Sequence, residues 1–297
     1  MKKDVDSLKS KFIKNNNKYD MFFTRYFYYL YGLAISRFKW INLPDEIDPV
    51  FMESQLFYRG NLLFFKDDVT DLFAVMNGFT SGKMDIYGFG DMRFAYANQY
   101  QIELNKTNSV LMRDNRADYP SADIIAMHAD ALANIRISRD VNLVANRTPV
   151  IISSTSDQRL SSSNIMKQII DCIPFIHLKN GAYSQDNFKA LKTDAPVLFP
   201  ELNSAMDWEI ADACKYLGIN AFYSGKKERL VSGETNGNKG ELEMARKNAL
   251  EPRQRSCEQI NKMFGLDVWV EFNSDIPILD SLSIENVSRE TSENEVV

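Results

Sequence analysis

The sequence predicts an α+β fold in which long helices alternate with a β-rich module. Two segments, 119–147 and 200–219, carry helical patterns with clear start and stop signals. A third segment, 44–118, is rich in strand-forming residues that alternate with polar ones. Of the 297 residues, 44% are hydrophobic and 25% charged, which is ordinary for a globular chain able to bury a core.

The charge is distributed unevenly along the chain. The net charge is −5, but residues 1–44 carry nine Lys and Arg against three Asp, so this part is +6 and the remainder −11. No apolar segment typical of a signal peptide follows Met1, and the most hydrophobic stretch, 21–43, is interrupted by Arg25, Arg37 and Lys39. We therefore expect no membrane span and a protein that is made and used in a cytoplasm.

Residues 1–18 form a basic arm. Its cations are all lysines: Lys2, Lys3, Lys9, Lys11, Lys14 and Lys18. Lysines bind nucleic-acid phosphates without sequence preference, but they also keep a flexible arm in solution. The two interpretations stay open.

Residues 19–43 predict a helix crowded with aromatic side chains, ended by Leu43-Pro44. Nine of them, from Phe22 to Trp40, are too many for one face, so either a deep core or neighbouring subunits must cover the helix. Their many tyrosines favour a partly hydrated interface.

Residues 44–118 predict a small β-rich module. We expect a hairpin between strands at 72–76 and 84–87, turned at Asn77-Gly78 or Ser81-Gly82, and a further strand at 96–104. The run from Gly78 to Lys83 has the wrong spacing for a phosphate-binding loop.

Residues 119–147 predict a long, alanine-rich helix that starts at Ser121. A short β-α-β unit follows within 148–199, with strands at 149–153 and 173–178 around a helix at 160–171.

Residues 200–219 predict the second long helix, with Pro200 in its first turn and Gly218 at its end. At about 100° per residue, Leu202, Met206, Ile210, Ala213 and Leu217 form an apolar stripe. Glu201, Glu209 and Asp212 gather on another face, which we expect to be acidic and open.

Residues 220–246 predict a long polar loop, in which Lys226, Lys227, Arg229 and Lys239 are scattered among polar residues. Loops this long are usually functional or disordered. A cationic loop beside an acidic helix suits a conduit for a polyanion, although from these residues alone a flexible linker is the better supported interpretation.

Residues 249–264 predict a helix, and alternation from Leu266 to Phe272 predicts a strand that completes the upstream β module. The end of the chain, 277–297, is polar and acidic, so we expect it to be disordered.

Catalytic signatures are absent from the sequence. The two histidines, His128 and His177, lie in a helical and a strand pattern without a nucleophile or metal-ligand spacing, and three distant cysteines, Cys172, Cys214 and Cys257, indicate neither a disulfide framework nor a zinc site. We expect no enzyme, metal or cofactor. A nucleic-acid-binding structural oligomer is an alternative function, and a hydrolase with an unrecognised site is a third.

Several sequence runs, in the same order, resemble one protein family. They are FKWINLPDEIDPVFMESQLFYRGNLLFFKD (38–67), LKTDAP (191–196), LGIN (217–220), KKERLVSGE (226–234), SCEQINKMFGLDVWVEF (256–272) and IENVSRETS (284–292). These runs are similar to the upper collar protein, the portal or head-to-tail connector, of small short-tailed bacteriophages.

The resemblance implies a portal-type subunit. Its parts would be the basic arm (1–18), the aromatic helix (19–43), a β-rich wing (44–118), the first stem helix (119–147), a β-α-β clip (148–199), the second stem helix (200–219), a channel loop (220–246), a wing helix and strand (247–276) and the acidic tail (277–297).

The resemblance also implies a role and partners. We expect a dodecameric ring at the head-tail junction of the virion, assembled in the host cytoplasm, through which a separate packaging ATPase moves double-stranded DNA. Major capsid, scaffold and lower collar or tail proteins would contact the ring. Lys192, Lys226 and Lys227 match family lysines that face the channel. Glu201 replaces a family lysine, and the arm lacks the arginines of relatives that bind a packaging RNA, so RNA binding stays open.

Overall fold

The computed structural model describes residues 17–84, 86, 90–97, 100–146, 150–152, 188–190, 196–220 and 232–273. The chain divides into two compact units, one formed by 1–135 and 204–297 and the other by 136–203. Several sequence predictions fall outside the described residues: those on the arm before Asn17, on the clip helix and second clip strand, on the acidic tail, and on His177, Lys192, Lys226, Lys227 and Arg229.

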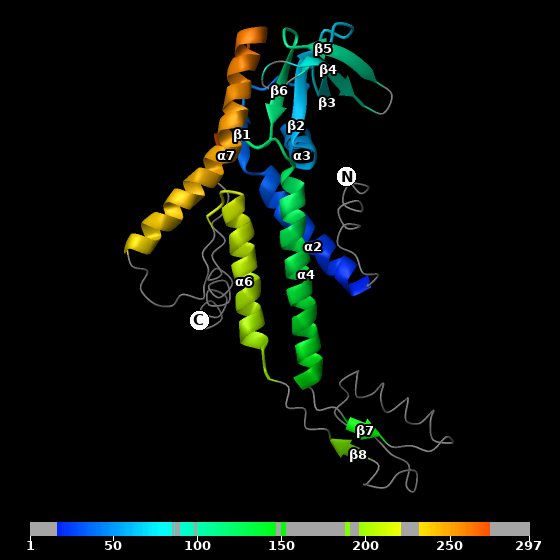
Figure 1. Ribbon diagram of the computed structural model, residues 1–297, viewed down its shortest axis with the longest axis vertical. Coiled ribbons are helices and arrows are strands. Elements are labelled where there is room, and N and C mark those ends of the chain that lie inside the picture. The colour runs from blue at the N-terminus through cyan, green and yellow to red at the C-terminus, as the bar shows by residue number, and fades with distance from the viewer. Residues whose placement is uncertain are drawn as a thin grey trace, which may run out of the picture. The chain divides into compact units, whose positions relative to one another are not determined.

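Helix α2 (Asn17–Ile35) is drawn in blue in Figure 1, and its sequence contains most of the aromatic residues noted above. It packs on helix α3 (Pro49–Arg59) through rings such as Tyr31 and Phe57, whose centroids are 5.2 Å apart. The predicted end of this helix at residue 43 is wrong, because strand β1 (Phe38–Ile41) begins after a short turn. Phe38 and Trp40 therefore belong to a sheet.

The sequence analysis missed helix α3. Asp48 caps its start by accepting a hydrogen bond from the backbone N–H of Val50, and Gly60 ends it in the left-handed conformation with φ 81°. A Cβ at Gly60 would also lie 2.9 Å from the backbone of Tyr119. Both the left-handed backbone conformation and the lack of space therefore require glycine at this position.

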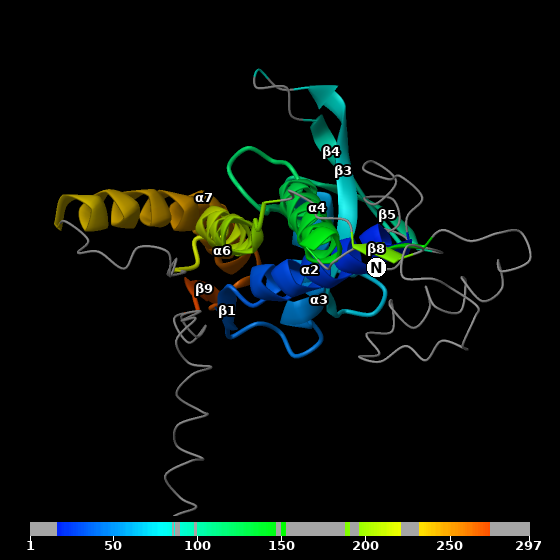
Figure 2. The same ribbon diagram turned by 90° about the horizontal axis from the view of Figure 1, so that it is seen from below.

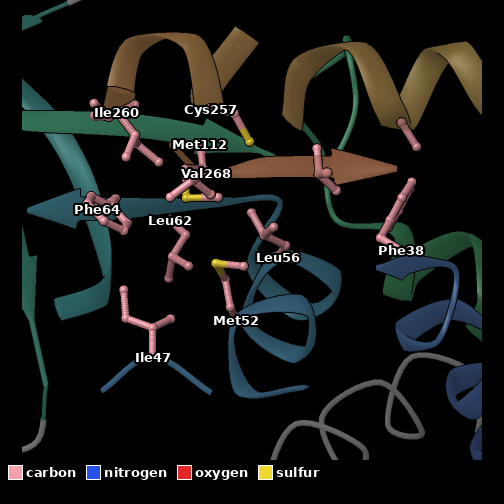
Figure 3. Packing of buried hydrophobic residues seen from close by; sticks show 13 residues of the cluster. Phe38, Ile47, Met52, Leu56, Leu62, Phe64, Met112, Cys257, Ile260 and Val268 are labelled. Atoms are coloured by element: carbon pink, nitrogen blue, oxygen red, sulfur yellow. The ribbon is translucent and has the colours of Figure 1, made fainter. Parts of the chain in front are cut away.

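The first unit contains a five-stranded antiparallel sheet, which lies at the top of Figure 1. Its order is β5-β4-β3-β2-β6, with strands β2 (Asn61–Lys66), β3 (Phe73–Met84), β4 (Gly90–Tyr96), β5 (Gln101–Asn105) and β6 (Ser109–Arg113). Alternate residues of β2 face two cores. Leu62 and Phe64 join a large cluster with α3 and the C-terminal elements, shown in Figure 3, whereas Leu63 and Phe65 join a smaller one.

Both predicted turn positions in this module are wrong. Strand β3 runs straight through Gly78, where a Cβ would lie 2.2 Å from Leu63 Cδ1, so the glycine makes room for a neighbouring strand. Gly82, with φ 85°, lies at an irregularity in the β3–β4 register. The single strand predicted at 96–104 is likewise two strands, because the chain turns between Ala97 and Tyr100.

Strand β9 (Trp269–Phe272) is present as predicted, but its predicted partner is wrong. It pairs with β1 in a separate two-stranded sheet, in the register Phe38↔Phe272, instead of joining the five-stranded sheet. Val270 and Phe38 nevertheless pack into the same large core as β2 and β6.

Two long helices match their predictions closely: α4 (Ser121–Asn146) and α6 (Phe199–Tyr216). Helix α7 (Ser232–Phe264) does not, because it begins 17 residues before the expected Ala249 and takes up the second half of the predicted polar loop. Glu, Lys, Arg, Met and Ala dominate 241–247, and these residues favour a helix once its C-terminal part is anchored in the core.

Helix α7 contains a proline, Pro252. Proline has no N–H, so the carbonyl of Asn248 four residues earlier lacks its usual helical donor. The backbone N–H of Arg116, in the connection between β6 and α4, donates to this carbonyl instead, over 3.2 Å. The Arg116 side chain also pairs with Glu251.

The second unit contains short elements and the adjoining helix ends. Strand β7 (Val150–Ile152) lies where a strand was predicted, and it pairs antiparallel with β8 (Phe188–Ala190), which was not predicted. Arg139 of α4 donates to Asn203 Oδ1 of α6 over 2.9 Å, and the Asn142 side chain bonds the backbone at Pro196 and Leu198.

Candidate nucleic-acid channel and helix junction

A buried cluster of four charged side chains lies where the helices meet the sheets. The Arg253 guanidinium donates to Glu53 through Nε (3.0 Å) and Nη2 (2.8 Å), and to Asp114 Oδ1 through Nη2 (2.8 Å). Arg37 Nη2 lies 3.8 Å from the same Asp114 oxygen, and none of the four side chains is more than 3% exposed. Two arginines and two carboxylates thus cancel their charges inside the protein. We call these four residues the junction cluster.

The two arginines of the junction cluster respond differently to burial. Burial opposes the charged form of both, but Glu53 and Asp114 more than offset it at Arg253 and raise the pKa of that guanidinium above its usual value. Burial lowers the pKa of Arg37, and Asp114 offsets this only in part. Arg253 is therefore the firmly held cation of the cluster.

The junction cluster also binds the ends of three helices. Arg37 donates to the carbonyl of Ala34 at the end of α2 and to that of Leu217 just after α6. Asp114 accepts from the backbone N–H and the hydroxyl of Ser121, the first residue of α4. Both long helices therefore start or end on one group of buried charges.

Within the first unit, α4 and α6 are joined by His128 and Glu209. Nδ1 of His128 lies 2.7 Å from Oε1 of Glu209, and both side chains are 14% exposed. The ring of Tyr216 lies 6.5 Å from the imidazole. Glu209 thus faces α4, and its predicted place on an open acidic face is wrong, because the helix turns it toward the histidine.

An open groove lies between α4, α6 and α7. It has a volume of about 440 Å³ and is lined by His128, Asp212, Lys215, Tyr216, Glu241 and Ala245. Lys215 forms an ion pair with Glu241 across it. Asp212 forms no ion pair within the described part of the chain and faces this groove.

Of the predicted channel residues, the structure describes Glu201, Glu209, Asp212 and Lys239, and each has different surroundings. Glu201 is exposed, Glu209 is paired with His128, and Asp212 lines the groove. Lys239 lies within helix α7, where a loop was expected, and Lys18 is exposed near the start of α2. Sequence reasoning missed the junction cluster and the groove, whose members come from distant parts of the chain.

Neither a metal-ligand cluster nor a thiol with a lowered pKa is found among the described residues. They contain no group of three or more His, Cys, Asp and Glu placed to hold a metal ion. Burial raises the pKa of the Cys214 thiol to about 11 and that of Cys257 to about 12, so neither is an activated nucleophile. None of the described helices combines the length and apolarity of a membrane span.

Comparison with known proteins identifies one family. The family model described as Phage Connector (GP10) matches residues 7–277 of this chain. The match includes the junction cluster, the groove and both long helices.

Three solved structures match this chain at low sequence identity. A chain from the portal and tail of native bacteriophage P68 matches with a TM-score of 0.48 and 18% identity, covering 99% of this chain and 98% of that one. A chain from the neck of a native gene transfer agent particle matches at 0.47 and 12%, covering 98% and 89%. An HK97 family phage portal protein from Corynebacterium diphtheriae matches at 0.46 and 8%, covering 86% and 94%.

Proposed function

Since the chain belongs to the phage connector family, we propose that it forms the portal ring at the head-tail junction of a phage particle. The single observation that carries this function is the family match over residues 7–277, which extends through every described element. The ring joins the head to tail components. It acts as a conduit and structural joint for genome packaging and ejection.

The arrangement of the helices supports a structural role. Helices α4 and α6 both attach to the junction cluster, so their orientation relative to the β-rich module is fixed by buried charges. A portal must keep this geometry while DNA moves past it. In this proposal the ring is a passive conduit, and a separate ATPase does the work of packaging.

The finer assignments extend this proposal. Residues 119–147 and 200–219 serve as stem helices, 148–199 as the clip, and 44–118 with 247–276 as the wing. Lys192, Lys226, Lys227, Arg229 and Lys239 contact DNA phosphates in the channel, with Glu201 as an acidic group that limits adhesion. Capsid, scaffold and lower collar proteins are the expected partners, and the lysine arm binds nucleic acid without sequence preference.

Electron microscopy and light scattering of the purified full-length chain test the central proposal. We expect rings, dodecameric by family resemblance, with a pore wide enough for a DNA duplex. A single-subunit mass at micromolar concentration would contradict the portal function. The alternative, a nucleic-acid-binding structural protein, would then remain. A titration of DNA binding at several salt concentrations would test it.

Particles carrying a triple substitution test the channel assignment. Replacing Lys226, Lys227 and Arg229 by Ala removes three cations from a loop that contributes little to packing by its composition. We expect rings and particles to assemble but to retain less full-length DNA than the parent. Equal retention would assign this segment to a passive connection.

A further inference from the structure

Helix α2 presents one uncovered face, which runs its whole length. Lys18, Met21, Arg25, Tyr28 and Gly32 are exposed and recur every three or four residues, so they form one stripe. Met21 is 58% and Tyr28 39% exposed, and a Cβ at Gly32 would meet nothing within 4 Å. Methionine, tyrosine and arginine are residue types enriched at protein interfaces. We call these five residues the α2 stripe.

Three large hydrophobic side chains, which we call the rim residues, are exposed on the helices that line the groove. Met127 is adjacent to His128, Met244 is adjacent to Ala245, and Trp208 lies one helical turn before Asp212. These three rim residues are 57%, 74% and 58% exposed. Each of the three helices that line the groove thus carries a large exposed hydrophobic side chain.

The α2 stripe and the groove lie on opposite sides of α4. Tyr19 of α2 donates to Asp130 of α4, whereas His128 of α4 lines the groove. Two residues along a helix correspond to about 200°, so Asp130 and His128 point in nearly opposite directions. The stripe faces away from α4, and in Figure 2 α2 passes below α4 while α6 and α7 lie to its left.

The charges of the two surfaces are complementary. The stripe is basic, and within the described part of the chain Arg25 has no ion-pair partner. The groove contains Asp212, also without an ion-pair partner there, and the Lys215–Glu241 pair, with the Glu209–His128 pair at its edge. In the described part of the chain, the stripe thus supplies a cation without an ion-pair partner and the groove a carboxylate without one.

We infer that the groove of one subunit receives the α2 stripe of the next subunit, with Arg25 pairing with Asp212. Met21 and Tyr28 then pack on the rim formed by Met127, Trp208 and Met244. Because the two surfaces lie on opposite sides of one chain, the contact is head-to-tail and repeats around a ring. This inference rests on the proposed portal function, which requires a ring but does not say which surfaces meet.

Charge reversal in the full-length protein tests the pairing. Arg25→Glu and Asp212→Lys each place like charges together, so each should raise the subunit concentration at half-assembly by about tenfold or more. The double variant restores the pair in reverse and should recover most of the loss. Arg255→Glu is the matched control, because Arg255 is exposed on α7 away from both surfaces, and it should assemble like the parent. Circular dichroism shows that each variant is folded.

Two results of this experiment would overturn the inference. One is that both single variants assemble like the parent, and the other is that the double variant is no better than either single one. If the parent itself stays a single subunit at every concentration, the portal function fails together with the inference. If the parent instead forms rings while the variants show neither the expected loss nor the expected recovery of assembly, the portal function stands and the contact between subunits lies elsewhere.

Photo-crosslinking gives an independent map of the contact. A benzoylphenylalanine residue at Tyr28, in rings mixed from isotopically labelled and unlabelled subunits, should crosslink to a peptide that contains Met127, Trp208 or Met244 of a second copy. Crosslinks confined to other surfaces of the second copy would overturn the inference. Crosslinking maps the contact in an intact ring. It therefore tests the inference even if the substitution at Tyr28 leaves assembly unchanged.

Discussion

The junction cluster and the groove use the same kinds of residue in opposite ways. In the junction cluster, two arginines and two carboxylates are fully buried and satisfy one another. In the groove, Asp212 is left without an ion-pair partner in the described chain, and the surrounding hydrophobic side chains are exposed. The comparison separates charges that hold one subunit together from charges that are available to another molecule.

The energetic consequence of this difference follows from solvation. A buried charge that loses its partner stays buried, so the folded state carries the full cost of its desolvation. An exposed charge that loses a partner is simply hydrated. Substitutions in the junction cluster should therefore reduce the stability of the subunit, whereas those in the groove should change its association.

The largest effect is expected from Arg253→Met. This change removes the cation but keeps much of the volume, and it leaves Glu53 and Asp114 buried without the guanidinium that bridges them. The free energy of unfolding should fall by about 3–5 kcal/mol, measured by chemical denaturation at one protein concentration. Arg255→Met, on an exposed side of the same helix, should cost less than about 0.5 kcal/mol. Similar effects at the two positions would remove the distinction between the regions.

A smaller loss is expected at His128, which lines the groove and contacts Glu209. The substitution His128→Ala removes the contact with Glu209, which is largely but not fully buried. We expect the free energy of unfolding to fall by about 1–2 kcal/mol, because water reaches the carboxylate that remains. Glu209→Gln, which keeps a hydrogen-bonding oxygen, should lose less than His128→Ala in the same denaturation measurement. A loss as large as that of Arg253→Met would show that the His128–Glu209 pair stabilises the subunit as strongly as the junction cluster does.

At the rim of the groove, Trp208→Ala should change association and hardly affect folding. Trp208 is 58% exposed, so we expect the dissociated subunit to lose less than about 1 kcal/mol of unfolding free energy. The concentration needed for assembly should nevertheless rise, as light scattering over a dilution series would show. Val69→Ala, at a residue that is 88% exposed, is a control that removes an apolar side chain elsewhere. Unchanged assembly by Trp208→Ala would count against the rim as a contact.

The smallest effect concerns the buried thiols. Burial raises the pKa of Cys214 to about 11 and that of Cys257 to about 12, so at pH 8 only roughly one in a thousand or fewer of these thiols is ionised in the folded chain. Alkylation should therefore be slow until denaturant exposes them, which mass spectrometry can follow. The raised folded pKa also means that stability is retained below about pH 9 and declines above it, as the unfolded thiols ionise. Fast labelling of either thiol in the folded protein would contradict this assignment.

Local sequence signals predicted the long helices well. Ser121 marks the start of α4, and Pro200 and Gly218 mark the limits of α6, because helix ends depend on residues close in sequence. The predicted position of the hairpin turn was wrong because it also rested on local signals alone. Gly78 and Gly82 suggest turns, but one accommodates Leu63 from the neighbouring strand and the other lies at a register irregularity.

The candidate site was harder to predict because its parts come together only in the folded chain. Glu53, Asp114 and Arg253 are far apart in sequence, and each alone is typical of a surface charge. Glu209 was assigned to an open face because its helical position alone does not reveal His128 on another helix. The start of α7 was missed because three glycines, Gly233, Gly237 and Gly240, make its first turns resemble a loop.

Pro252 makes the docking of two segments mutually dependent. While α7 stands alone, the Asn248 carbonyl has no donor, and while the β6–α4 connection stands alone, the Arg116 amide has no acceptor. Neither segment reaches its full hydrogen bonding before the other arrives, so the two should open together. The Arg116 amide proton should therefore exchange with solvent at the same rate as the core amides of α7, and one amide signal would report when that helix leaves the body of the subunit.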